Sequence, residues 1–535
     1  MPSEHHPIVI IGAGPVGLSM ALELEGLGHR PVIIEKRTEA SDGSRAICYS
    51  QRALEIWNRL GSVEPVIERG IQWKVGKVFH GDRLAYQFDL QPDAGYEMPA
   101  FVNLQQNLLE QYMIGQVGDR GMEIRWGQEV TSLDASDTGA TLTIATDSGP
   151  STMTCDWLIA ADGVRSQARR ELGLGFTGQV FEDRFLIADV RMKADFPTER
   201  WFWFDPPFHE GQSTLLHRQA DNVFRIDFQL GWDADPEEER KPENVIPRIQ
   251  AMLGEEHDFD LVWVSVYTFQ CRRMESFVHG RVLFAGDSAH QVSPFGARGA
   301  NSGVQDAENL AWKLDLVMTG RAPEALLTSY DAERIVAADE NILNSTRSTE
   351  FITPKGTTSH ALREAVLTLA REHAFARPMV NSGRLDHATI YPNSPLSTGD
   401  TDVFDTRIGP GHAALDAAVT RDGDDDYLLR HLGWGFRGML VTEHDGSITD
   451  PQAAAIEELT RLDIPVETIL VGPADTSTIP KAALVDVFGQ IRTRYDTTPG
   501  TYYLFRPDQY IAARWRTLDP AAVAAAVATA THRGG

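Results

Sequence analysis

The chain has 535 residues, 42% of them hydrophobic, and a formal net charge of −27. A chain of this length exceeds what one hydrophobic core serves, so we expect two or three domains. The negative charge disfavours nucleic acid and anionic membrane as partners, because both are polyanions. The three cysteines are scattered without a CxxC pair, which predicts neither a disulfide framework nor a metal site. No basic and apolar leader and no membrane-spanning apolar run is visible, so we expect a cytoplasmic protein.

The first predicted unit is a βαβ nucleotide-binding segment over residues 8–36, IVIIGAGPVGLSMALELEGLGHRPVIIEK. An apolar strand runs into the turn GAGPVG, a helix follows, and a second apolar strand ends in an acid. Gly12 would permit the tight turn, Gly14 the close approach of a pyrophosphate, and Gly17 the packing of helix on strand. The helix N-terminus would hold the phosphates, and Glu35 is placed to hydrogen-bond a ribose hydroxyl.

Two later strand ends carry acids next to glycines. Asp162 and Gly163 follow one buried apolar run, and Gly286 and Asp287 follow another. Ligands bind at the carboxyl ends of strands in doubly wound sheets, so we expect both acids to contact a ligand, with a helix cap as the alternative role of Asp162. A glycine-rich loop then leads to a long helix with Asn301 near its start, which predicts a second helix N-terminus aimed at the same ligand.

The composition between these motifs changes to strands rich in β-branched and aromatic residues, which predicts a mostly antiparallel sheet. Such a sheet, facing the nucleotide-binding part, would form one wall of a substrate pocket. We therefore expect an α/β protein divided into residues 1–177 (nucleotide-binding, first part), 178–275 (substrate sheet), 276–395 (nucleotide-binding, second part, and helices) and 396–535 (a C-terminal α/β domain).

Three motifs in one order, GAGPVG with Glu35, AADGVRS, and GDSAHQVSPFGARGANSGVQDAENLAWKL, resemble the single-component flavoprotein aromatic hydroxylases, the family of 4-hydroxybenzoate hydroxylase and phenol hydroxylase. The length and the extra C-terminal segment are similar to the branch that contains 3-(3-hydroxyphenyl)propionate hydroxylase and phenol hydroxylase. The resemblance implies a Rossmann-like FAD-binding domain, a thioredoxin-like C-terminal domain and a homodimer. That last domain has no CxxC, so redox activity is not expected of it, and Pro499 is a candidate for a cis-proline turn.

The resemblance assigns the first site to FAD. It implies Glu35 on the adenosine ribose, Arg45 beside the pyrophosphate and Asp287 on the ribityl chain. Arg298 would stabilise negative charge on the reduced flavin. Only one GxGxxG motif is present, which fits transient docking of NADPH or NADH, with Asp162 implicated in both cofactors. The implied cofactor-binding residues are Gly12, Gly14, Pro15, Val16, Gly17, Glu35, Lys36, Arg45, Gln105, Gln106, Asp162, Gly163, Gly286, Asp287, Pro294, Gly296, Arg298, Gly299, Ala300 and Asn301.

The chemistry that the resemblance implies is hydroxylation of a small phenolic compound. NADPH or NADH would reduce FAD, O₂ would add at flavin C4a, and the hydroperoxide would transfer oxygen to an electron-rich ring. This requires a dry pocket and a group that takes up the phenol proton. The candidate catalytic residues are His217, Arg225 and Tyr49, with a structural role as the alternative. The phenol hydroxylase branch has an acid near Tyr49 where this chain has Ile47, so its proton relay does not transfer directly.

Other functions fit the same flavin motifs. The stretch WFWFDPP at residues 201–207 resembles the WxWxIP signature of flavin-dependent halogenases, with Asp205 in place of isoleucine, although alternating aromatic residues are also ordinary in a core strand. Baeyer–Villiger oxidation and N-hydroxylation remain open, because the motifs describe the flavin and not the substrate. A flavin-containing binding protein without turnover is the alternative outside the enzymes.

Overall fold

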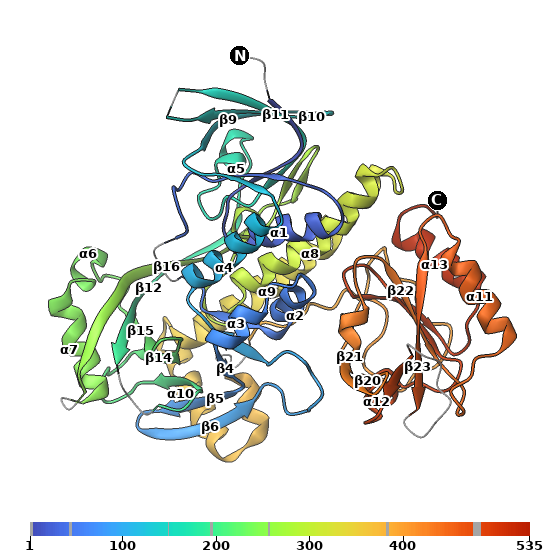
Figure 1. Cartoon of the computed structure of the whole chain (residues 1–535). Coiled ribbons are helices and arrows are strands. Elements are labelled where there is room, and N and C mark those ends of the chain that lie inside the picture. The colour runs from blue at the N-terminus through green and yellow to red at the C-terminus, as the bar shows by residue number, and fades with distance from the viewer. Residues whose placement is uncertain are drawn as a thin grey trace.

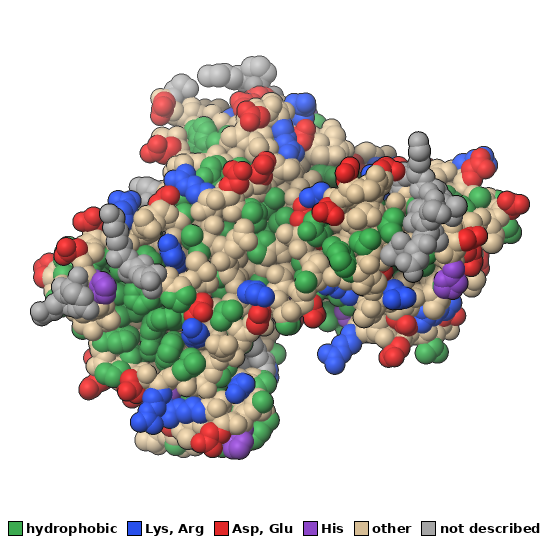
Figure 2. Space-filling model, turned by 60° about the horizontal axis from the view of Figure 1, so that its bottom comes forward, with side chains coloured by type: hydrophobic (Ala, Val, Ile, Leu, Met, Phe, Trp, Pro, Cys, Tyr) green, Lys and Arg blue, Asp and Glu red, His purple; other side chains and the backbone are tan. Residues whose placement is uncertain are grey.

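The computed structural model describes residues 4–41, 45–147, 149–192, 196–254, 257–380, 385–473 and 483–534. Three large sheets organise these residues, and the C-terminal sheet stands to one side of the other two (Figure 1). Acidic and basic side chains are interspersed on the face drawn in Figure 2 rather than gathered in one patch. Within the described residues, none of the helices is long and apolar enough to cross a membrane.

The first sheet carries the predicted strand–helix–strand unit. Strands β18, β11, β1, β2 and β8 lie side by side and run parallel, and β9 and β10 form an antiparallel extension next to β11. Residues 8–11 of β1 are buried, as expected of a strand covered on both faces. The strands of this sheet are β1 (Glu4–Ile11), β2 (Val32–Ile34), β8 (Glu123–Arg125), β9 (Glu129–Ser136), β10 (Gly139–Ala145), β11 (Ser151–Ala160), β17 (Val278–His279) and β18 (Val282–Phe284).

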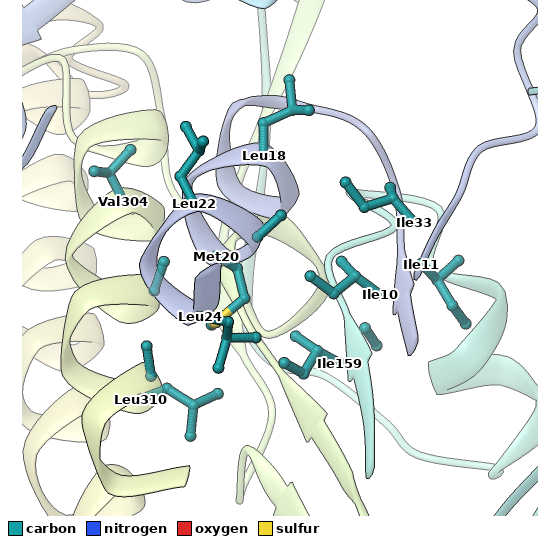
Figure 3. Close-up of a cluster of buried hydrophobic side chains, with 14 of the residues drawn as sticks. Ile10, Ile11, Leu18, Met20, Leu22, Leu24, Ile33, Ile159, Val304 and Leu310 are labelled. Carbon is teal, nitrogen blue, oxygen red and sulfur yellow. The ribbon is translucent and has the colours of Figure 1, made fainter. Parts of the chain in front are cut away.

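The core of this part lies between the sheet and two helices, α1 and α8. Figure 3 shows Leu22 of α1 between Ile10 of β1 and the α8 side chains Val304 and Leu310. The close approach of α1 and α8 requires a glycine at position 303, because a Cβ atom there would lie 2.5 Å from Val16 Cγ2 of α1. The helices of the chain are α1 (Pro15–Gly26), α2 (Gln51–Arg59), α3 (Glu64–Arg69), α4 (Gln106–Asp119), α5 (Gln167–Glu171), α6 (Pro236–Glu239), α7 (Pro242–Leu253), α8 (Gly299–Met318), α9 (Thr328–Ile352), α10 (Thr357–Glu372), α11 (Asp450–Thr460), α12 (Gln490–Tyr495) and α13 (Pro520–Ala530).

The second sheet has the strand order β19-β16-β12-β15-β14-β13-β5-β6. It is mixed: β13 pairs with β5 in parallel, whereas the other described pairs of this sheet are antiparallel, and β5 and β6 come from residues before the stretch 178–275. The alternating pattern of β5 and β6 did not reveal their partner, because pairing is decided by tertiary contacts. The strands are β5 (Val75–His80), β6 (Arg83–Asp89), β12 (Thr177–Met192), β13 (Arg200–Phe204), β14 (Ser213–Arg218), β15 (Val223–Leu230), β16 (Phe259–Arg273) and β19 (His290–Gln291).

A small antiparallel sheet of three strands joins these two large sheets. Its middle strand, β7 (Phe101–Asn103), pairs with β3 (Cys48–Ser50) on one side and with β4 (Ile71–Trp73) on the other. The edge of β3 that β7 does not pair faces the N-terminus of α8, where the Asn301 side chain contacts it. The small sheet thereby lies between the nucleotide-binding part and the second sheet.

The C-terminal sheet is also mixed, with β24, β23 and β22 parallel and the outer strands antiparallel. It docks on α9 through Arg506, whose guanidinium is fully buried against Glu333. The described residues include no cis peptide bond, so the expected cis-proline turn at Pro499 is wrong. The strands are β20 (Ala418–Arg421), β21 (Asp424–Tyr427), β22 (Phe436–Val441), β23 (Val466–Pro473), β24 (Leu484–Asp486), β25 (Tyr502–Phe505) and β26 (Ile511–Trp515).

Candidate active site

The N-terminus of α1 forms an open cradle. Gly12 has φ +108°, and a Cβ atom there would lie 2.4 Å from Ala161 O, just after the adjacent strand β11. A Cβ atom at Gly14 would meet nothing within 4 Å, so open space lies in front of it. The backbone N–H groups of Gly14, Val16 and Gly17 find no acceptor among the described residues, and Pro15 has no N–H group to satisfy. These donors and the helix dipole are suited to a phosphate group.

Glu35 ends β2, as expected, and its carboxylate is held by its own neighbours. Its Oε2 accepts from Ala13 N at 2.8 Å, and its Oε1 accepts from Arg37 N at 2.9 Å and from Arg37 Nε at 3.1 Å. Burial raises the pKa of Glu35, but these hydrogen bonds outweigh it and hold the pKa below its ordinary value. Lys36 is exposed, whereas Arg37 also pairs with the buried Glu110. The sequence analysis missed both partners, since they belong to no motif.

Asp162 fulfils the expected alternative of a helix cap and retains a free oxygen. Its Oδ2 accepts from Gln167 N at 2.7 Å and from Ala168 N at 3.1 Å, at the start of α5. Its Oδ1 is buried without a hydrogen-bond partner, and burial raises the pKa of the carboxyl group. Gly163 has φ +76° with open space beside it. The carboxylate is therefore both a cap and an unsatisfied acceptor beside the cradle.

Gly286 and Asp287 form a short 3-10 turn after β18 that the buried Asp306 holds in place. Asp306 Oδ2 accepts from Gly286 N at 2.8 Å and lies 2.6 Å from His290 Nε2. Arg334 Nε binds the other oxygen of Asp306, and although burial raises the pKa of Asp306, the charges of His290 and Arg334 hold it well below its ordinary value. The side chain of Asp287 is half-buried, and burial raises its pKa. Sequence reasoning missed Asp306.

The glycine-rich loop brings the N-terminus of α8 to the same place. A Cβ atom at Gly299 would lie 3.8 Å from Asp287 Oδ1. The N–H groups of Gly299, Ala300 and Asn301 have no acceptor among the described residues. Upstream in the loop, Gly296 is buried with φ +106°, and Pro294 is exposed.

Asn301 and Arg298 use their side chains within the protein. The Asn301 amide accepts from Ser50 N at 3.0 Å and donates to Cys48 O at 2.9 Å, so it completes the free edge of β3. The buried Arg298 guanidinium donates to Asn341 Oδ1 at 2.8 Å and to a backbone carbonyl at 3.0 Å. An external ligand would therefore meet the backbone N–H groups at the start of α8 and the nearby positive charge of Arg298.

The helix α4 begins beside the second sheet with two glutamines. Gln106 Oε1 accepts from Ala46 N at 2.9 Å. Gln105 donates to a backbone carbonyl at 3.2 Å, while its Oε1 is buried without a partner. Gln105 lines a cavity of about 200 Å³ together with Asp189 and Trp263 of the sheet. The Arg45 side chain is exposed.

A row of buried polar side chains crosses the inner face of the second sheet. Asp189, Arg225, His217 and Arg200 are neighbours in register on four adjacent strands, and each is at most 4% exposed. Arg225 forms a two-pronged ion pair, with Nε 2.8 Å from Asp189 Oδ1 and Nη2 2.9 Å from Asp189 Oδ2. Its third nitrogen donates to Arg45 O at 2.9 Å. The row therefore lies directly against the loop that precedes β3.

The structure brings His217 and Arg225 together and places Tyr49 elsewhere. His217 Nδ1 lies 3.9 Å from Cys48 Sγ, and burial, followed by the charges of Arg200 and Arg225, holds the pKa of His217 well below its ordinary value. Because neighbours on a strand face opposite ways, Tyr49 points away from His217. Its ring contacts a core tryptophan at 5.2 Å, which corrects its grouping with the other two residues.

The aromatic stretch at residues 201–207 begins with β13. Trp203 stacks on Phe79, with 5.2 Å between ring centroids, in the cluster that α7 covers on the outer face. Phe202 belongs to a different cluster, on the inner face. The two tryptophans therefore face away from the polar row, and the alternation is that of a core strand.

These features fit FAD. The N-termini of α1 and α8 each carry three N–H groups without an acceptor among the described residues, and both lie close to the 3-10 turn. A Cβ atom at Gly286 of the turn would lie 2.9 Å from Val16 Cγ2 of α1. The unpartnered Oδ1 of Asp162 borders this region and supplies an acceptor for a hydroxyl group, and the unpartnered Oε1 of Gln105 offers another beside the second sheet. A dinucleotide offers both the phosphates and the hydroxyls that such a set of groups binds.

Comparisons with known proteins define the class. A family model described as FAD binding domain matches residues 5–345, more than half of the chain, so the chain belongs to this family. The chain is 30% identical over 542 residues to 6-methylpretetramide 4-monooxygenase of Streptomyces rimosus, covering 95% of this chain and 90% of that protein. It is 28% identical over 442 residues to 3-(3-hydroxy-phenyl)propionate/3-hydroxycinnamic acid hydroxylase of Mycolicibacterium smegmatis, with 80% and 76% covered.

Solved structures agree on the fold. The flavin-dependent monooxygenase PieE, in complex with FAD and substrate, superposes with a TM-score of 0.83 at 21% identity over 100% of both chains. Aklavinone-11 hydroxylase, with FAD and aklavinone, gives 0.77 at 21% identity, again over 100% of both chains. The chain is an FAD-dependent monooxygenase. It belongs among the flavin aromatic hydroxylases, as the three sequence motifs indicated.

Proposed function

We propose that this monooxygenase hydroxylates a phenolic aromatic compound at the expense of NADPH or NADH and O₂. The observation that carries the proposal is the polar row on the inner face of the second sheet, which lies against the loop before β3 and consists of Asp189, Arg225, His217 and Arg200. Hydrogen-bonding side chains there are suited to a ring hydroxyl, whereas the FAD cradle alone would serve any flavin reaction. The names of the two relatives support an oxygenated aromatic or polycyclic substrate.

The cofactor residues take the following roles in the proposal. The N–H groups at Gly14 and Val16 bind the pyrophosphate, Glu35 orients the adenosine ribose, and Asp287 binds the ribityl chain. The α8 N-terminus and the Arg298 charge favour negative charge on the ring system. FAD, when bound, supplies the electron transfer from the nicotinamide and the activation of O₂.

The protein's own contribution to the reaction is a shaped and dry pocket. Trp263 and Tyr267 of β16 are half-buried on the same face as the polar row and give it an aromatic wall. Burial raises the pKa of Tyr267, and the Asp287 carboxylate raises it further. Arg225 is fixed by Asp189 and positions the loop, while His217 stays neutral and orients the ring hydroxyl.

The proposal extends to the organisation of the chain. Residues 1–177 and 276–395 form the FAD-binding domain, 178–275 with β5 and β6 form the substrate domain, and 396–535 form a thioredoxin-like domain. The parallel strands β24, β23 and β22 flanked by antiparallel β25 and β26 support that last assignment. We also infer a cytoplasmic homodimer.

The test is a spectrum of the purified protein followed by oxidation of NADH and NADPH against substituted mono- and polycyclic phenols. Flavin absorbance, phenol-stimulated oxidation and a product heavier by one oxygen atom are the expected results. Flavin without stimulation by any phenol would contradict the proposal. A product with oxygen inserted into a ring bond would assign a different oxygenation.

A further inference from the structure

Asp227 is a carboxylate on the inner face of the second sheet that has no role in the site described so far. It lies on β15, two residues after Arg225, so both side chains share one face. Phe224, Ile226 and Phe228 of the same strand pack in the outer cluster with α7. Asp227 therefore faces the flavin-binding side, as Arg225 does through its bond to the loop.

The carboxylate of Asp227 lacks the partners that a buried charge normally has. Its Oδ1 is buried and accepts no hydrogen bond, and its cross-strand neighbours are the apolar Ile187 and Leu215. Arg225 is committed to Asp189 at 2.8 Å. Both apolar neighbours are buried, whereas Asp227 as a residue is only partly buried, so part of it remains accessible on this face of the sheet.

The surroundings of Asp227 connect it to the flavin side. Burial raises the pKa of Asp227 to about 7, and the negative charge of Asp189 contributes to this rise. The positive charges of Arg225 and Arg200 oppose it. Arg225 and Asp227 also act on the thiol of Cys48, whose backbone carbonyl is bound by Asn301 at the start of α8. The unpaired carboxylate therefore lies on the same face of the sheet as Arg225, which bonds to the loop before β3.

We propose that Asp227 is a catalytic residue that binds the hydroxyl group of the phenolic substrate and takes up its proton. In this step the phenol O–H bond breaks, the proton bonds to a carboxylate oxygen of Asp227, and the electron pair remains on the phenol oxygen. That pair raises the electron density of the ring for oxygen transfer. The inference rests on the proposed function. It also accounts for Ile47, since the acid comes from the sheet instead of the segment before β3.

The experiment compares holoenzymes carrying Asp227→Asn, Asp227→Ser and Asp227→Glu with the wild type. The control is Asp260→Asn, the same chemical change at an exposed position of β16. The substrate is the phenol that most stimulates NADPH or NADH oxidation by the wild type. Flavin content, kcat, KM, product formed per nicotinamide oxidised and the pH dependence of kcat/KM are measured.

A base with this pKa makes kcat/KM of the wild type fall about tenfold per pH unit below about pH 7. Asp227→Asn and Asp227→Ser should lower kcat/KM about 100-fold at pH 8, mainly through kcat, and abolish this acid limb. Asp227→Glu should keep the limb. Asp260→Asn should match the wild type.

The outcomes separate the two proposals. A wild type stimulated by a phenol, together with uncharged Asp227 variants that keep both the rate and the acid limb, overturns the role of Asp227 alone. A wild type stimulated by no phenol overturns the proposed function and the inference with it. The serine variant decides the matter if the asparagine variant does not retain flavin.

Discussion

Replacing Asn301 by alanine tests whether this residue acts on the cofactor or on the protein. Its side-chain amide accepts from Ser50 N at 3.0 Å and donates to Cys48 O at 2.9 Å. These two backbone groups lie on the edge of β3 that β7 does not pair, so the amide replaces a neighbouring strand. Asn301 and Ser50 are each 1% exposed. Asn301→Ala therefore leaves a buried donor and a buried acceptor without partners.

The cost follows from the two orphaned groups. Each unsatisfied buried group costs about 1–3 kcal/mol, so the variant should lose about 2–6 kcal/mol of folding free energy. Water entering the space left by the amide would bring the loss toward the lower end. The matched control is Asn58→Ala, which removes a single, partly buried bond to Glu97 at 2.8 Å and should cost only about 1 kcal/mol.

The assay is denaturant unfolding of the FAD-free proteins, followed by FAD titration. We expect Asn301→Ala to unfold at clearly lower denaturant than the wild type even without FAD, and to bind FAD more weakly because β3 and its loop are loosened. The reasoning is refuted if the FAD-free variant and wild type unfold together and only FAD binding changes. That result would mean that the amide contacts the cofactor directly.

Three further predictions concern other parts of the molecule. Asp287→Ala should lose most bound FAD, measured as the flavin-to-protein ratio after purification, and full occupancy would contradict its ribityl role. Asp189→Asn should destabilise the holoenzyme by about 3–5 kcal/mol in denaturant unfolding, because it leaves the buried Arg225 charge poorly compensated, and an unchanged midpoint would contradict this. Burial, opposed by the Arg52 charge, raises the pKa of Glu55 from 4.5 to about 7, so the folded protein holds this proton more tightly and loses stability as the pH rises between these values. Glu55→Gln should therefore gain stability over the wild type on going from pH 5 to pH 8, by at most about 3 kcal/mol, and a difference independent of pH would refute the argument.

The nucleotide-binding unit was predictable because its determinants are local. Gly17 is required by a contact within the βαβ unit, because a Cβ atom there would lie 2.0 Å from Gly12 O. The apolar run of β1 and the acid at the end of β2 have fixed spacing along the chain. Such features can be recognised in the sequence alone, and the same is true of α8, which starts after the glycine-rich loop.

Partners distant in the sequence could not be predicted in this way. Arg37 and Glu110 form an ion pair that supports the cradle, but they belong to no motif. Asp306 of α8 accepts a hydrogen bond from Gly286 of the 3-10 turn, and only tertiary packing brings this turn and α8 together. His217 and Arg225 were found as polar residues on strands, but their common row with Asp189 depends on strand order.

The sequence by itself determined the strand–helix–strand unit with its turn glycines and strand-end acids, because these features act over a few residues, and the resemblance of its motifs to a known family indicated the cofactor. Only the tertiary structure decided that the second sheet is mixed and which side chains share its inner face. It also placed the Tyr49 ring in the core, and it left Asp227 Oδ1 without a hydrogen-bond partner on that inner face. The physical reason is that burial and pairing depend on contacts between distant strands, which no spacing along the chain records.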